Sequence, residues 1–198
     1  MPHWRERLIT RVTAECRPVD KLSHMVRLVP LTRLVGEGSA YDDDTVFAAV
    51  WLHDLGVFHG HRPEDPVQLA TWDHTAYAMK CTPQILASIG FPIGKIESVV
   101  EAIRTHQAKD NPTTIEGTIL RDADLLEQLG AVAVLRMASK VGRDSRFPTF
   151  DEVEVALKNQ LERLPMQLRL ETSKRLAEPK REAMRQYLVS FQTENEMG

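Results

Sequence analysis

A histidine and an aspartate stand side by side at the end of an otherwise apolar segment, VWLHDLG at residues 50–56. Segments this apolar are normally buried, and a buried charge without a partner costs several kcal/mol. His53 and Asp54 should therefore be paired, hydrogen-bonded or bound to a cation. The sequence predicts that other parts of the chain supply their partners.

Further histidines and a second carboxylate fall on apolar faces of predicted helices. Residues three and four apart share one face of a helix, and on that spacing these side chains should point toward the core: His24, His74, His106 and Asp124. Asp122 lies about 200° around the helix from Asp124, so it is expected to face solvent or to support a ligand from behind. His59 and His61 fall in a polar loop and are expected to be exposed, with a place at the mouth of the site as the alternative.

A single inward histidine is more often a hydrogen-bonded core residue than a ligand. Four such histidines with two carboxylates are harder to explain in that way, because clustered carboxylates repel one another unless a cation holds them. Imidazole together with carboxylate oxygen suits first-row ions such as iron, manganese, zinc, nickel or cobalt better than magnesium. The pattern therefore predicts a site for one or two divalent metal ions.

The elements that must position these residues are predicted to be helical almost throughout, because no stretch shows the alternation of a strand. The predicted helices cover residues 4–15, 20–35, 44–55, 69–81, 83–89, 93–106, 113–130, 131–140, 150–163 and 167–192. The acidic run at 42–44 is suited to a helix N-terminus, and Thr113 to Glu116 has the form of a capping box. Gly56 should end the helix over 44–55, and 57–70 should be a loop. Pro30 and Pro179 predict kinks.

Composition limits the classes of function. The chain has 198 residues, 42% hydrophobic and 27% charged, which is typical of one globular domain over 1–198. A net charge of −3 gives no reason to expect a nucleic-acid partner. No apolar run approaches a membrane span or a signal peptide, so a cytoplasmic protein with no membrane partner is expected, and Cys16 and Cys81 are expected to be core thiols.

The ordered motifs resemble those of the HD superfamily of metal-dependent phosphohydrolases. They are His24-x-x-Arg27, the doublet His53-Asp54, and DADLLEQLGA at residues 122–131. The likeness is greatest to compact bacterial single-domain members and covers about residues 18–140. It implies an all-α HD-domain helical bundle, with about 150–193 as a C-terminal helical extension.

Carried over to this chain, the resemblance implies that one metal is held by His24, His53, Asp54 and Asp124. His74 and His106 extend the pattern to H…HD…H…H…D. That fuller set resembles the binuclear branch of the superfamily, in which Asp54 would bridge two ions and the two added histidines would hold the second.

The resemblance implies a phosphatase or phosphodiesterase that acts on a small phosphate ester or nucleotide through a metal-activated hydroxide. Besides Asp54, the catalytic candidates are Arg27, one turn after His24, and Lys109, in the loop after His106; Arg136 is a weaker one. Two alternatives stay open: a di-iron oxygenase, and a metal-stabilised protein that binds a ligand without turnover. The sequence leaves the substrate and the oligomeric state open, a homodimer included.

Overall fold

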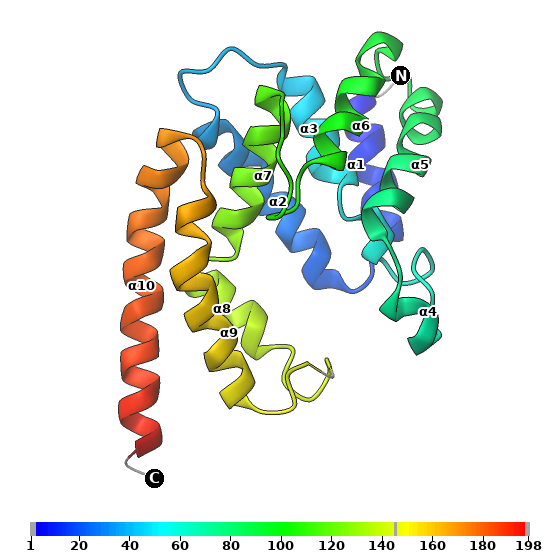
Figure 1. The fold of residues 1–198 in the computed structure, drawn as a ribbon. Helices are drawn as coiled ribbons and strands as arrows, with labels where there is room; N and C mark the ends of the chain where they lie inside the picture. The colour runs from blue at the N-terminus through cyan, green and yellow to red at the C-terminus, as the bar shows by residue number, and fades with distance from the viewer. Residues whose placement is uncertain (1–2, 145, 197–198) are drawn as a thin grey trace. The chain divides into compact units, whose positions relative to one another are not determined.

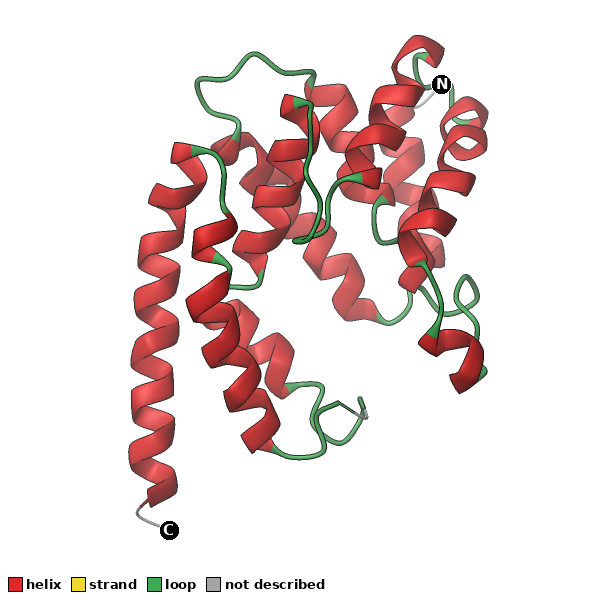
Figure 2. Cartoon of the chain, in the orientation of Figure 1, coloured by secondary structure: helices red, strands yellow, loops and turns green. Residues whose placement is uncertain are grey.

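The computed structural model describes residues 3–144 and 146–196, and at Val19 it describes the backbone alone. This part of the chain contains ten α-helices, three short 3-10 turns and no β-strand (Figures 1 and 2). The predicted all-α fold is therefore confirmed. The chain forms two compact units, one up to Arg121 and one from Asp122 onward.

The first unit is built around one apolar helix. Its helices are α1 (Trp4–Glu15), α2 (Val19–Val35), α3 (Asp43–Leu52), α4 (Pro66–Ala70), α5 (His74–Ser88) and α6 (Ile96–Arg104), and α7 (Ile115–Glu127) begins in it. Helix α3 packs against α1, α2 and α6. Every residue from Thr45 to Leu52 is buried, because a helix covered on several sides must be apolar all round. This helix carries the His53-Asp54 doublet at its C-terminal end.

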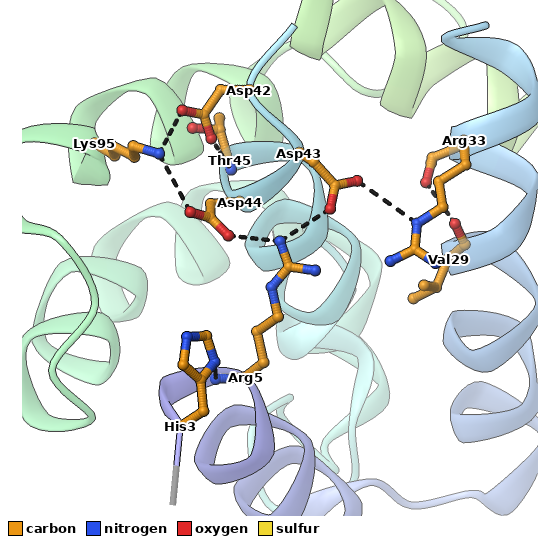
Figure 3. A network of polar contacts seen from close by, with 10 residues as sticks. His3, Arg5, Val29, Arg33, Asp42, Asp43, Asp44, Thr45 and Lys95 are labelled. Atoms are coloured by element: carbon orange, nitrogen blue, oxygen red, sulfur yellow. Dashed lines mark hydrogen bonds and ion pairs between the residues drawn. The ribbon is translucent and has the colours of Figure 1, made fainter.

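The N-terminus of α3 is held by its acidic run, as predicted. The Asp42 carboxylate caps the helix by accepting a hydrogen bond from the Thr45 backbone N–H at 2.9 Å. Cations from neighbouring segments surround this first turn (Figure 3). The ion pairs are Arg5 with Asp43 and Asp44, Lys95 with Asp42 and Asp44, and Arg33 with Asp43. They fix α3 to α1, to α2 and to the 3-10 turn that precedes α6.

The second unit contains the end of α7 together with α8 (Ala131–Ala138), α9 (Phe150–Arg163) and α10 (Glu171–Glu196). Helices α8, α9 and α10 pack against one another, and α9 runs alongside α10 in Figure 1. A capping box of Thr149 and Glu152 starts α9. Among the described residues, no helix is both long enough and apolar enough to cross a membrane.

Several predicted boundaries are wrong. The helices predicted over 69–81 and 83–89 are one helix, α5, because burial of Ile85 and Leu86 holds the chain helical beyond Pro83. The predicted loop 57–70 ends in α4, which Asp65 caps. The predicted capping box at Thr113 is also wrong: Thr114 accepts from the Gly117 N–H, and Glu116 accepts from the Asp42 N–H at 3.0 Å.

Asp122 does not face solvent, so one of the two positions expected for it is wrong. Its side chain is fully buried, and Oδ2 accepts hydrogen bonds from the backbone N–H groups of Arg169 and Leu170, both at 2.9 Å. These two N–H groups immediately precede α10. Because backbone donors at a helix start lack partners within the helix, Asp122 fixes the segment that leads into α10 within the second unit.

Candidate metal centre

The His53-Asp54 doublet lies where α3 ends. Helix α3 stops at Leu52, three residues earlier than predicted. His53 keeps helical backbone angles, with φ −58° and ψ −37°, whereas Asp54 departs from them, with φ −97° and ψ 12°. The chain then forms a 3-10 turn over Leu55–Val57. The chain therefore changes direction directly after the imidazole of His53, at the residue that carries the carboxylate, Asp54.

The prediction that Gly56 ends the helix is wrong, because α3 already ends at Leu52. Gly56 instead allows two backbone segments to approach closely. A Cβ atom at this position would lie 2.4 Å from the His74 carbonyl oxygen and 2.7 Å from the His74 Cα atom. The Trp72 indole Nε1–H also donates to the Gly56 carbonyl oxygen at 2.7 Å. The turn after Asp54 is thus in direct contact with the start of α5, which carries His74.

The structure brings four of the predicted histidines together in the first unit. Their rings meet edge to face, with centroid separations of 5.5 Å for His24 and His53, 5.1 Å for His53 and His106, and 6.2 Å for His74 and His106. His24, His53 and His106 are buried, and His74 is half-buried. With Asp54 they form what we call the histidine–aspartate cluster.

His74 reaches this cluster for a reason that differs from the predicted one. The sequence placed it inside a helix over 69–81, but α4 ends at Ala70 and His74 is the first residue of α5. Asp73 caps α5 by accepting from the Ala76 backbone N–H. The capped helix start, in contact with Gly56, sets the position of His74.

Two of the imidazoles have a fixed tautomer. The His53 Nδ1 atom lies 2.8 Å from the Val50 carbonyl oxygen, and the His106 Nδ1 atom lies 2.6 Å from the Ile103 carbonyl oxygen. A carbonyl can only accept, so Nδ1 of each neutral ring must carry the proton. The lone pair then lies on Nε2, which is the arrangement found in metal-binding histidines whose other nitrogen bonds a backbone carbonyl.

The Asp54 carboxylate is held in its ionised form. Its side chain is 14% exposed, and burial alone would raise its pKa. Electrostatic interactions with the neighbouring His53, Lys21 and His24 outweigh that effect and hold the pKa of Asp54 well below its usual range. Burial lowers the pKa of His74, which favours the neutral imidazole that metal binding needs.

Donor atoms of the cluster come close enough to share cations. The ligand atoms of Asp54, His74 and His106 all lie within 4.8 Å of one another, and those of His24 and His53 lie within the same distance of each other. Neutral imidazoles combined with an ionised carboxylate form a donor set that fits a divalent first-row metal. The residues present therefore fit the metal that the sequence pattern predicted.

The remaining predicted site residues lie on α2, in the loop after α6 and in the second unit. Arg27 lies one turn after His24 in α2 and is half-buried, and Lys109 is exposed in the loop after α6. Asp124 lies on α7 in the second unit, where its Oδ2 atom accepts from the Gln128 side-chain amide at 3.3 Å. Arg136 pairs with Glu127 at 3.5 Å. The roles of Arg27, Lys109 and Asp124 stay predictions.

Lys21 is the site residue that the sequence analysis missed. Its Nζ atom lies 3.3 Å from Asp54 Oδ2. Lys21 precedes His24 by three residues on α2, so the same helical spacing that identified the histidines could have placed it on the same face.

His61 also departs from its expected exposure. It is half-buried, with its Nδ1 atom 3.0 Å from the Tyr77 hydroxyl and its Nε2 atom 3.4 Å from Glu15. His61 and Tyr77 help to line a cavity of about 220 Å³, which also reaches Leu55, the residue after Asp54. His59 is exposed, as predicted.

Comparison with solved structures shows the same fold in small bacterial proteins. YpgQ of Bacillus subtilis is 22% identical over 96% of this chain and 95% of its own, with a TM-score of 0.76. A predicted HD superfamily hydrolase from an uncultured Thermotogales bacterium is 23% identical over 96% of this chain and 91% of its own, with a TM-score of 0.67. YpgQ has also been crystallised in complex with ADP.

An all-helical fold with a histidine–aspartate doublet at a helix end defines a class of metal-binding domain. The family model for the HD domain matches residues 22–129, more than half of the chain. The chain therefore belongs to the HD domain family. No curated protein matches it significantly.

Proposed function

We propose that the protein is a metal-dependent phosphohydrolase, a phosphatase or phosphodiesterase that acts on a small phosphate ester or nucleotide. The observation that carries this proposal is the convergence of four imidazoles on one ionised carboxylate, with the Nδ1 atoms of His53 and His106 bonded to backbone carbonyls. Membership of the HD domain family supports it. The ADP bound by YpgQ supports a phosphorylated substrate.

In this proposal His24, His53, Asp54 and Asp124 bind a divalent ion, chosen from iron, manganese, zinc, nickel and cobalt, and His74 and His106 offer a further position beside Asp54. The bound metal would lower the pKa of a coordinated water molecule and polarise a phosphoryl oxygen. Arg27 would stabilise the negative charge that develops on the phosphoryl oxygens, and Lys109, exposed in its loop, would bind the outer phosphate groups.

The test combines metal analysis with phosphate release. The purified protein is loaded with each candidate metal and assayed on nucleoside mono-, di- and triphosphates and on bis(p-nitrophenyl) phosphate. Asp54→Ala should lose both bound metal and turnover. The matched control is Asp20→Ala, which removes an exposed aspartate from α2, outside the cluster. Turnover by metal-free Asp54→Ala at the parent rate would refute the proposal.

A di-iron oxygenase is the second candidate. The group of Asp54, His74 and His106 favours it, because these residues offer donor atoms for a second metal ion in addition to those of His24 and His53. It predicts oxygen consumption by the iron-loaded protein in the presence of an organic substrate. Turnover that is unchanged under strict anaerobiosis would eliminate it.

A further inference from the structure

Lys21 places a positive charge beside the histidine–aspartate cluster. Its Nζ atom lies 3.3 Å from Asp54 Oδ2, and its side chain is 26% exposed. Lysine is a compact cation on a flexible four-carbon stem. The ammonium group can therefore contact the carboxylate in one rotamer and reach solvent in another.

The two oxygen atoms of Asp54 face different neighbours. Oδ1 is directed toward His53, whose Nε2 atom lies 3.9 Å away, and Oδ2 is directed toward Lys21. A carboxylate that bridges two metal ions gives one oxygen to each. If Oδ1 serves an ion on the side of His53, Oδ2 must serve the ion held by His74 and His106. That oxygen is the one beside the ammonium group.

We propose that Lys21 is a tethered competitor of the second metal ion. It neutralises Asp54 at Oδ2, so the cluster keeps one divalent ion tightly. The group of Asp54, His74 and His106 accepts a second ion only when Lys21 swings away toward solvent. The inference rests on the proposed metal centre and sets how many ions that centre holds.

The charges around Asp54 determine whether Lys21 raises or lowers the affinity for a second metal ion. With Lys21 in place, a second divalent ion would add two positive charges beside an ammonium group that already compensates the carboxylate. Repulsion between charges only a few ångströms apart in a partly buried site is large. Removing the charge of Lys21 leaves Asp54 with one fewer cation, and a second metal ion can supply the missing charge.

The experiment compares Lys21→Met, which keeps most of the stem and removes the charge, with Lys21→Arg, which keeps the charge. Lys80→Met is the matched control, because Lys80 is exposed on α5. Each protein is dialysed to equilibrium against a series of free Mn²⁺ concentrations at pH 7.5, and bound manganese is counted by mass spectrometry. Electron paramagnetic resonance separates single Mn²⁺ ions from exchange-coupled pairs.

The wild-type protein, Lys21→Arg and Lys80→Met should bind one ion tightly and a second much more weakly. Lys21→Met should bind the second ion at least about tenfold more tightly and show the spectrum of a coupled pair. Lys21→Gln serves in its place if Lys21→Met does not fold. Two equally tight ions in the wild type, or a neutral variant that still binds only one, would overturn the inference.

The outcome separates this inference from the proposed function. A wild-type protein that holds one metal ion and hydrolyses phosphate esters, together with unchanged stoichiometry in the neutral variants, would refute the role of Lys21 alone. A wild-type protein that binds no metal would refute both.

Discussion

Gly56 offers a test of how the cluster is assembled, because its replacement by alanine adds one methyl group at a defined contact. The new Cβ atom would lie 2.4 Å from the His74 carbonyl oxygen and 2.7 Å from the His74 Cα atom. Both neighbours are backbone atoms, so no side-chain rotation can relieve the clash. The backbone of α5 or of the turn after Asp54 must move by about 1 Å to restore an ordinary contact of about 3.5 Å.

Overpacking of this kind destabilises a protein by about 1–3 kcal/mol. For a chain of this size, about 1 kcal/mol corresponds to about 2–4 °C in Tm, so we expect Gly56→Ala to lower Tm by about 2–12 °C. The displaced start of α5 should also move His74 away from Asp54. A lower affinity for the second metal ion is therefore expected, alongside the loss of stability.

Gly94→Ala is the matched control, because a Cβ atom there meets nothing within 4 Å. Thermal unfolding followed by circular dichroism, with and without added metal, measures both variants. Gly94→Ala should stay close to the wild type, within about 0.5 kcal/mol. Equal Tm values for the two variants would refute the reasoning that the contact of Gly56 with His74 constrains the turn.

Two further predictions concern stability. Asp122→Ala should lower the free energy of unfolding by about 2–4 kcal/mol, since it leaves two backbone N–H groups near α10 without their acceptor; a loss below about 0.5 kcal/mol in urea unfolding would contradict this. Asp44→Asn should cost about 0.5–1 kcal/mol at pH 7, because Asp44 is partly exposed. Its pKa is lowered: burial alone would raise it, but Arg5 and Lys95 more than offset this. The stabilisation is therefore present above the unfolded pKa of about 3.8 and lost as the pH falls through the lower folded pKa. The difference between Asp44→Asn and wild type should shrink below pH 4 in urea titrations, and a constant difference down to pH 2 would contradict the assignment.

Local signals were sufficient for much of the fold. The helices Trp4–Glu15 and Phe150–Arg163 have the bounds that the sequence predicts, and the acidic run caps α3 as expected. Helical spacing also placed His24, His53 and His106 on buried faces. These features depend on residues close together in the chain, which periodicity and capping rules describe well.

Features that depend on contacts between residues far apart in the chain could not be predicted from the sequence. Pro83 lies inside α5 because burial holds the helix on both sides of it, and Gly56 is explained by the backbone of α5 rather than by the end of α3. Asp122 contacts a segment 47 residues away, which no local rule identifies. Helical spacing places Lys21 on the face of His24, but a charged residue on a helix is usually solvated, and the distance of 3.3 Å to Asp54 is what shows the pairing.

The ends of two helices set the orientation of the buried histidines His53 and His106. Helix α3 stops at Leu52 and α6 stops at Arg104, and the last four carbonyl groups of a helix lack partners within it. The Val50 and Ile103 carbonyls belong to these groups, and each accepts the Nδ1–H of the histidine three residues later. Had α3 continued to residue 55, as the sequence predicted, the Asp54 backbone N–H would have competed for the Val50 carbonyl. The early end of the helix thus fixes the tautomer of His53 and turns Asp54 toward the other histidines in a single step.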